Sequence, residues 1–181
     1  MSIDAQFWRS IQEHDFAIPD GYALADLTAA LIAQIGTPDA DLRELTYDIL
    51  SEWILSGKYT PADLRQLIAA FIANLQIGLG EKDTDSVFTR SFSVLLLGET
   101  INYDNEAEYL TQDEVQLIVA AVLDYQAREQ DWRDQVGGKG WAHAREHIKL
   151  CFTDILDSRY VSEMDKAHIE DILRQGRFHS S

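Results

Sequence analysis

The residues best suited to chemistry lie close together in the segment 139–147, Lys-Gly-Trp-Ala-His-Ala-Arg-Glu-His. His143 and His147 are four residues apart, so in a helix both imidazoles project from the same face. Two nitrogens at this spacing can bind one divalent metal ion, and H-x-x-E-H is the inverted zinc-protease pattern, with Glu146 as the general base. A catalytic zinc needs a third protein ligand, and no spacing among the 34 residues after His147 selects one. The sequence therefore favours packing or hydrogen bonding for both histidines, with metal binding as the alternative.

Arg90 is the second unusual residue, because it lies in the most apolar stretch of the chain, 87–101. An unpaired guanidinium would be costly there, so we expect a carboxylate partner. Asp48, Asp131 and Asp134 are three candidates that the sequence does not separate. A buried ion pair between repeats is favoured over an arginine that binds an anion.

Other catalytic patterns are missing from the sequence. Ser91 and Ser93 lack the G-x-S-x-G elbow of a nucleophile, and the segment 137–140 lacks the P-loop pattern. Cys151 falls on an apolar stripe and is predicted to be a core thiol, and we expect all four tryptophans in the core. The stripe comprises Trp141, Ala144, Ile148, Cys151 and Ile155. No cofactor motif is recognised. A protein without enzymatic activity is favoured over an enzyme, because helical-repeat folds typically present binding surfaces.

Length and composition are those of one globular domain. The chain has 181 residues, of which 46% are hydrophobic and 25% charged, and it is long enough to bury roughly 70% of its unfolded surface. No apolar run approaches the ~20 residues that span a bilayer, and the N-terminus lacks the pattern of a signal peptide. A single cysteine excludes an internal disulfide and is typical of a reducing compartment. We therefore expect a cytoplasmic protein.

The net charge of −16 is unevenly distributed. Residues 1–138 contain 8 Lys and Arg against 24 Asp and Glu, whereas residues 139–181 contain 7 of each. An acidic surface repels phosphate groups, so the charge disfavours both nucleic acid and anionic membranes as partners. A basic protein partner and simple solubility both remain as explanations of the charge.

Helix-start signals recur at a fixed interval, at Thr60-Pro-Ala-Asp63, Thr111-Gln-Asp-Glu114 and Ser162-Glu-Met-Asp165. Each begins with a hydroxyl that can accept a hydrogen bond from the first helical turn and places a carboxylate three residues later. The two intervals are both 51 residues. A recurrence of this size is typical of stacked helix pairs.

The predicted fold is all-α, a HEAT-like or armadillo-like superhelix of about three antiparallel helix pairs behind an N-terminal cap. The periodicity of apolar residues places the cap at 1–36 and the pairs at about 39–77, 84–128 and 140–175. The apolar segment 87–101 is expected at the centre of the stack, with a loop at about 104–110. The third pair is expected to begin with a helix over 141–156.

Three blocks of the sequence resemble an uncharacterised, mostly bacterial family called domain of unknown function 2785. They are 41–54, 85–93, and 129–133 leading to 139–143. The resemblance implies an all-helical, HEAT-like superhelix, in agreement with the repeats. It also implies that six residues match a family pattern, and we take them as candidate ligand-binding residues: Arg90, Asp131, Arg133, Trp141, His143 and His147.

Two hypotheses of function follow. The favoured one is a cytosolic helical-repeat module that binds a protein or peptide on its concave face, because such folds present extended binding surfaces. The alternative is a protein that binds a metal or small anion through His143 and His147, with a hydrolytic activity as one form of it. Neither the partner nor the oligomeric state can be deduced from the sequence.

Overall fold

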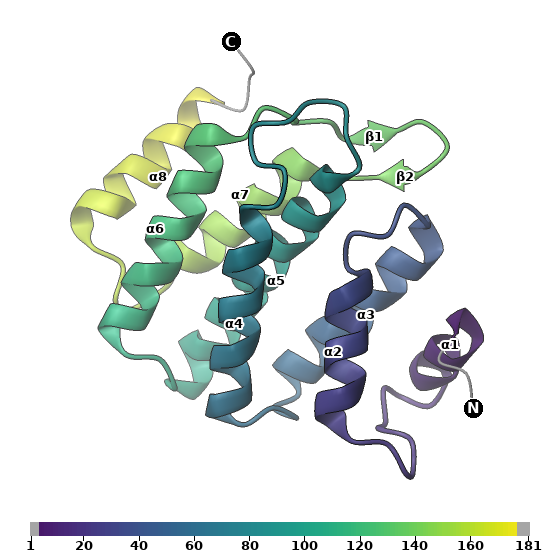
Figure 1. The fold of residues 1–181 in the computed structure, drawn as a ribbon. Helices are drawn as coiled ribbons and strands as arrows, with labels where there is room; N and C mark the ends of the chain where they lie inside the picture. Colours follow the sequence, from purple (N-terminus) through teal and green to yellow (C-terminus); the bar gives the residue numbers. More distant parts are fainter. Residues whose placement is uncertain (1–3, 177–181) are drawn as a thin grey trace.

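The computed structural model describes residues 4–176, and within them the chain forms eight helices and one pair of very short strands (Figure 1). The fold is therefore all-α, as predicted. The elements are α1 (Ala5–Glu13), α2 (Leu24–Gln34), α3 (Ala40–Leu55), α4 (Pro61–Leu75), α5 (Ser86–Ala107), α6 (Gln112–Arg128), β1 (Gln135–Val136), β2 (Gly140–Trp141), α7 (Ala144–Leu156) and α8 (Glu163–Gln175).

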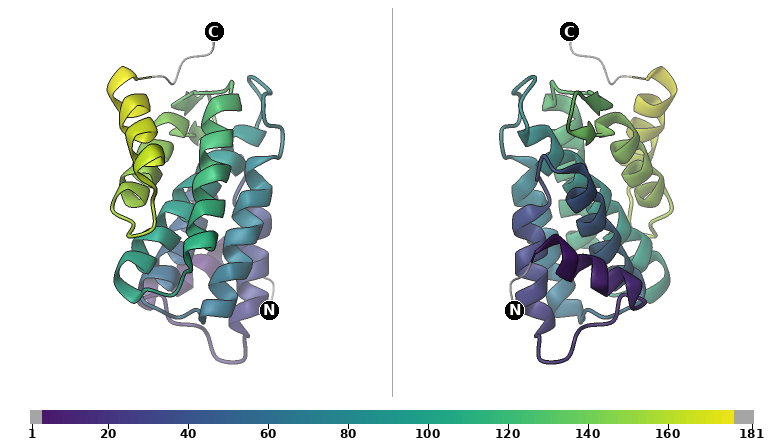
Figure 2. Two further views of the ribbon diagram at one scale, coloured as in Figure 1. Left: turned by 90° about the vertical axis from the view of Figure 1, so that its left-hand side faces the viewer. Right: turned by 90° about the vertical axis from the view of Figure 1, so that its right-hand side faces the viewer.

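Helix α5 lies at the centre of the molecule (Figures 1 and 2). It packs against α3 and α7 on either side and against α4, and α4 in turn packs on α6. Helices α1 and α2 cover α3, and α8 covers α7. The predicted central position of the apolar segment 87–101 is confirmed, because only Thr89 and Glu99 within it are not buried.

The recurring helix starts are confirmed as N-caps. Thr60 and Asp63 form a reciprocal capping box at α4, in which the Asp63 amide donates to Thr60 Oγ1 at 3.3 Å and the Thr60 amide donates to Asp63 Oδ2 at 3.0 Å. Thr111 and Glu114 form the same box at α6. At α8, Ser162 Oγ accepts the amide of Asp165 at 3.1 Å. Each cap satisfies amides that would otherwise lack a partner in the first turn.

Helix α5 is longer than the sequence predicted. A loop was expected from about 104, but the helix continues to Ala107. The side chain of Asp104 is fully buried, accepts the amide of Leu110 at 2.6 Å and pairs with Arg159 at 2.8 Å. One contact is local and the other joins residues 55 positions apart, and together they satisfy a buried carboxylate at which the sequence predicted a loop.

The start of α7 was predicted too early. Gly140 and Trp141 belong to β2, which pairs antiparallel with β1, and α7 begins only at Ala144. Gly140 has φ +77°, and a Cβ there would lie 2.7 Å from the Cβ of Ala40 in α3. Only glycine therefore allows this hairpin to lie so close to α3.

Trp141 was wrongly assigned to the core stripe of the helix. Its side chain is 47% exposed, because it lies in the hairpin before the helix begins. The other three tryptophans are buried, and Cys151 is fully buried as predicted. None of the helices in the range 4–176 has the length and apolar character needed to cross a membrane.

Candidate functional site

The segment 129–143, which connects α6 to α7, lies at one end of the molecule (Figure 1). Four of the six candidate residues belong to it, and Arg90 and His147 contact it through Glu129 and His143. The N-terminal ends of α3, α5 and α7 meet this segment, as its contacts with Arg43, Arg90 and Ser91 demonstrate. The six residues form two separate clusters there. One is built on Arg90 and the other on His147.

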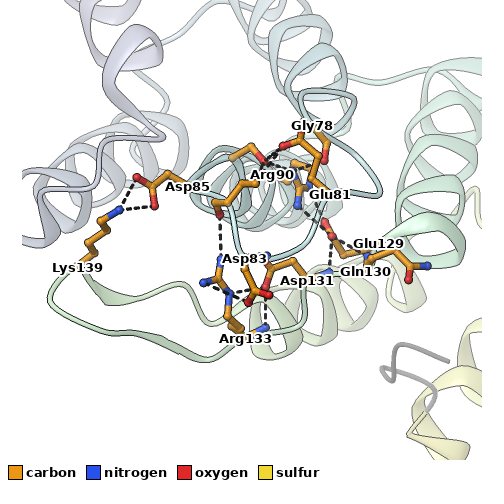
Figure 3. Close-up of polar contacts among 12 residues, drawn as sticks. Gly78, Glu81, Asp83, Asp85, Arg90, Glu129, Gln130, Asp131, Arg133 and Lys139 are labelled. Atoms are coloured by element: carbon orange, nitrogen blue, oxygen red, sulfur yellow. Dashed lines mark hydrogen bonds and ion pairs between the residues drawn. The ribbon is translucent and has the colours of Figure 1, made fainter.

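Arg90 is fully buried and pairs with Glu129, the C-cap residue of α6 (Figure 3). Its Nε donates to Glu129 Oε2 at 2.5 Å and its Nη2 donates to Oε1 at 3.0 Å, so the pair is bidentate. Nη1 donates to the carbonyls of Ile77 and Gly78, each at 2.9 Å, and to Ser86 Oγ at 2.7 Å. All these partners come from the protein itself, and this supports a structural arginine.

The expectation of a buried ion pair is confirmed, but the partner is none of the three proposed aspartates. The pair also joins two helices of one predicted helix pair, α5 and α6, instead of different repeats. Arg90 contacts the preceding pair through the carbonyls of Ile77 and Gly78, which follow α4. Sequence periodicity missed Glu129 because the residue ends a helix, where the angular position of a side chain is not fixed by the helical pattern.

Asp131 and Arg133 form a second ion pair next to Arg90 (Figure 3). Arg133 Nε and Nη2 donate to the two oxygens of Asp131 at 2.7 and 2.6 Å. Asp131 also accepts the amide of Asp83 at 3.0 Å, and Arg133 Nη2 donates to the carbonyl of Thr84 at 2.9 Å. Both residues therefore fasten the loop before α5 to the segment after α6.

Arg43 of α3 is a residue that the sequence analysis did not single out. Its guanidinium is fully buried and lies 3.8 Å above the ring of Phe88. It donates to the carbonyls of Thr37 at 2.7 Å, Lys139 at 2.9 Å and Trp141 at 3.0 Å. The pKa of Arg43 is lowered from its ordinary value, chiefly because the guanidinium is buried. Arg43 lies in the block 41–54 that carries the family resemblance, and this was the signal that could have identified it.

The two histidines lie beside each other, with ring centroids 5.5 Å apart, but His143 lies outside the helix that the spacing predicted for both. His143 is the N-cap residue of α7, has φ +47° and stacks on Trp141 at 4.9 Å. His147 is buried, packs against Phe92 and lies with Nδ1 2.8 Å from Ser91 Oγ. Burial, followed by the charge of His143, lowers the pKa of His147 to about 4, so this imidazole is neutral at pH 7.

Ser91 and His147 resemble a nucleophile and its base only at first sight. Ser91 Oγ donates its proton to the carbonyl of Ala142, so His147 Nδ1 must donate to Ser91. Proton transfer in catalysis would require the opposite direction. Ser91 is also fully buried, so the contact fastens the segment before α7 to α5.

A metal centre finds no support in the part of the chain that the structure describes. Within residues 4–176, no group of three or more His, Cys, Asp or Glu side chains is arranged to hold a metal ion. His143 and His147 face each other, but a third ligand is missing from that group. The contacts that the structure shows for the pair are with Trp141, Phe92 and Ser91.

A pair of carboxyl groups lies farther along α5 and α7, and the sequence analysis did not identify it as a site. Tyr47 of α3 donates to Glu99 Oε1 at 2.7 Å. Asp154 lies against the backbone of Gly98, where a Cβ would be 2.7 Å from Asp154 Oδ2. Burial, then the charges of Glu99 and Asp157, raises the pKa of Asp154 to about 7. The missing side chain at Gly98 is what allows this close approach.

Asp154→Asn is expected to stabilise the protein at pH 8 by about 1–2 kcal/mol, after allowance for partial solvent exposure. Because the folded pKa lies above the unfolded value, the native state retains a proton between about pH 4 and pH 7 that the unfolded chain has lost. Stability therefore falls as the pH rises through this window, and the variant removes that loss.

Urea denaturation of the variant and the parent protein at pH 4, 6 and 8 measures this effect. The difference should vanish at pH 4. His147 contributes the opposite slope, because its lowered pKa reduces stability as the pH falls from about 6.5 to 4, but that contribution cancels in the comparison. Asp20→Asn is the control at an exposed position in the connection between α1 and α2, with an expected change within ~0.5 kcal/mol. A pH-independent difference for Asp154→Asn would contradict the prediction.

Taken together, the fold and the two clusters define an all-helical protein whose connecting segments are fastened by buried arginines. A family model described as "Protein of unknown function (DUF2785)" matches residues 75–178, and the chain belongs to this family. The match confirms the resemblance inferred from the sequence, and it covers the second and third blocks but not residues 41–54. Searches among curated proteins and among solved structures found no match.

Proposed function

We propose that this protein is a cytoplasmic HEAT-like interaction module that binds a Lys- and Arg-rich segment of another protein across the face formed by α3, α5 and α7. The observation that carries the proposal is a row of carboxylates on that face, which we call the acidic face. Within residues 4–176, none of its members takes part in an ion pair. The acidic face comprises Glu44, Asp48, Glu99, Asp154 and Asp157.

The electrostatics of the acidic face support a cationic partner. Reduced solvation is the largest cause of the raised pKa values of Glu44 and Asp48, and Asp48 raises the pKa of Glu44 further. The pKa of Asp154 is raised in the same way, with Glu99 as the second cause. The charges of Arg43 and His143 lower the pKa of Glu44 in part, but its pKa stays raised. Carboxylates with reduced solvation and no ion pair gain from a partner that supplies positive charge.

Two exposed apolar side chains accompany these carboxylates. Leu150 is 54% exposed and lies between His147 and Asp154 on one stripe of α7. Trp141 is 47% exposed and stacks on His143 at the start of the same helix. Interfaces combine such apolar anchors with charges that direct the partner. A segment with both basic and apolar residues fits this surface.

The test is a titration with a Lys- and Arg-rich peptide that contains leucine, followed by 15N-detected NMR shifts and by calorimetry. We expect shifts at α3 and α7, and binding that weakens steeply with salt. Glu44→Gln combined with Asp48→Asn should weaken binding by about tenfold or more. Glu163→Gln combined with Glu170→Gln in α8 removes the same charge elsewhere and should change binding by less than about threefold. Equal losses in both double variants would refute a specific acidic face.

A further inference from the structure

A second surface lies between α2 and α4, away from the acidic face. The two helices leave a groove of about 440 Å³ between them. In contrast, α4 and α6 pack directly on each other. The groove is lined by Leu24, Ala25, Thr28, Ala29 and Ile32 of α2, by Tyr59 before α4, and by Asp63, Gln66 and Leu67 of α4.

The floor of the groove offers no unsatisfied polar group to a ligand. Thr28 Oγ1 donates to the carbonyl of Leu24 at 2.8 Å, so the 2.8 Å contact with Tyr59 is donated by the tyrosine hydroxyl. Both side chains are buried, and their polar atoms satisfy each other. The α2 wall above them is otherwise aliphatic, with Ala25 and Ala29 exposed, whereas the α4 wall adds Asp63 and Gln66 to Leu67. Such a surface favours apolar side chains over a polar small molecule.

The length of the groove matches a short helix. Its α2 wall runs from Leu24 to Ile32, which at 1.5 Å per residue is about 12 Å, or roughly two helical turns. The small alanine side chains let another backbone approach α2 closely. An amphipathic helix can bury residues at i, i+3, i+4 and i+7 over that distance.

The charges beside the groove select the partner. Asp26 lies in the first turn of α2, Asp63 lines the groove, and α2 contains neither Lys nor Arg. The only cation of α4, Arg65, is already paired with Glu114. A second copy of this chain would bring the same carboxylates and a net charge of −16, so self-association through this groove is disfavoured. Lysine or arginine beside the apolar stripe of another protein would be attracted.

We propose that the groove between α2 and α4 docks an amphipathic helix from another protein, with an apolar stripe of two turns flanked by Lys or Arg. This inference does not depend on the acidic face. The two surfaces lie on different helices, and each can be altered without the other.

The probe is a synthetic peptide with leucines at i, i+3, i+4 and i+7 and lysines on the flanks, compared with a scrambled peptide of the same composition. Binding is followed by fluorescence anisotropy, by the helical circular dichroism of the peptide and by 15N-detected NMR. To remove binding at the acidic face, these measurements use the protein with Glu44→Gln and Asp48→Asn. In that protein we expect micromolar binding of the periodic peptide only, a gain of helicity, and shifts confined to α2 and α4.

Substitutions on α2 locate the binding site. Ala29→Gln fills the groove without a change of charge and should weaken binding by about tenfold or more. Ala33→Gln is the matched control, because Ala33 is exposed on the same helix but does not line the groove, and it should change binding less than about twofold. Ala25→Gln provides a second groove variant if Ala29→Gln lowers stability. Glu44→Gln with Asp48→Asn should leave this binding intact, so failure of the acidic face and failure of the groove are distinguishable.

Three outcomes would overturn the inference. The scrambled peptide could bind as tightly as the periodic one, which would indicate attraction by charge alone. Ala33→Gln could weaken binding as much as Ala29→Gln, which would place the site elsewhere. A concentration-dependent dimer of the parent protein that Ala29→Gln abolishes would make a second copy the occupant of the groove.

Discussion

Glu129→Gln is expected to lower the free energy of unfolding by about 3–5 kcal/mol, because it leaves the Arg90 guanidinium buried without a counter-charge. Both side chains of this pair are 0% exposed. Glu129 Oε1 also accepts the amides of Gln130 and Asp131, each at 2.8 Å, so the carboxylate shapes the first turn of the segment after α6. Glutamine keeps the size of the side chain but loses the charge and one acceptor.

Urea denaturation followed by far-UV circular dichroism measures this loss. Arg90→Met should be similarly destabilising, since it leaves the Glu129 carboxylate without its cation. The double variant with Arg90→Met and Glu129→Met should be more stable than the sum of the two single losses predicts, because neither charge is then left alone. Glu146→Gln removes one charge from an exposed ion pair and should cost less than about 1 kcal/mol. A loss below 1 kcal/mol for Glu129→Gln would contradict a structural role and make Arg90 a candidate for binding an anion.

Arg43→Met is expected to cost about 2–3 kcal/mol and to loosen the hairpin of β1 and β2. The substitution takes the donor from the carbonyls of Lys139 and Trp141 in the hairpin and from that of Thr37 before α3. Hydrogen bonds to charged groups contribute about 1.5–3 kcal/mol each, but removal of the buried charge offsets part of this loss. Methionine retains the contact with the ring of Phe88.

Hydrogen exchange followed by mass spectrometry measures the loosening of the hairpin directly. Amides of 135–143 should exchange faster in Arg43→Met, whereas those in the centre of α5 should change only as far as global stability falls. Lys139→Met, which removes only the exposed pair with Asp85, is the control in the same hairpin and should cost less than about 1 kcal/mol. If the amides of the hairpin exchange at the same rate in Arg43→Met, the hydrogen bonds of Arg43 do not hold the hairpin in place.

The helices could be predicted because their signals are local. Thr60 and Thr111 each satisfy their own capping box, so the residues within one turn determine where α4 and α6 begin. His143 and Trp141 could not be placed in the same way. Where the sequence predicted the first turn of a helix from Trp141, the structure has the second strand of a short hairpin. The hairpin lies close to α3 because Gly140 has no side chain, and apolar periodicity does not predict such a contact.

In the candidate site, too, some features could be predicted from the sequence and others could not. The sequence required that Arg90 have a partner, because burial of a lone charge is costly, and this requirement was met. It could not identify Glu129, whose side chain reaches Arg90 only once α5 and α6 pack together. It also did not connect Glu99 with Asp154, because the two residues are 55 positions apart in the chain and are brought together by the packing of α5 on α7.

The sequence by itself determined the all-helical fold, the recurring helix starts, the central position of α5 and the need to neutralise Arg90. These properties depend on hydrogen bonds and apolar periodicity within a few residues of each other. Only the tertiary structure decided which carboxylate pairs with Arg90, that Arg43 holds the hairpin, and that Asp154 retains a proton near neutral pH. Those outcomes depend on distances between helices and on loss of solvent, which no local pattern specifies.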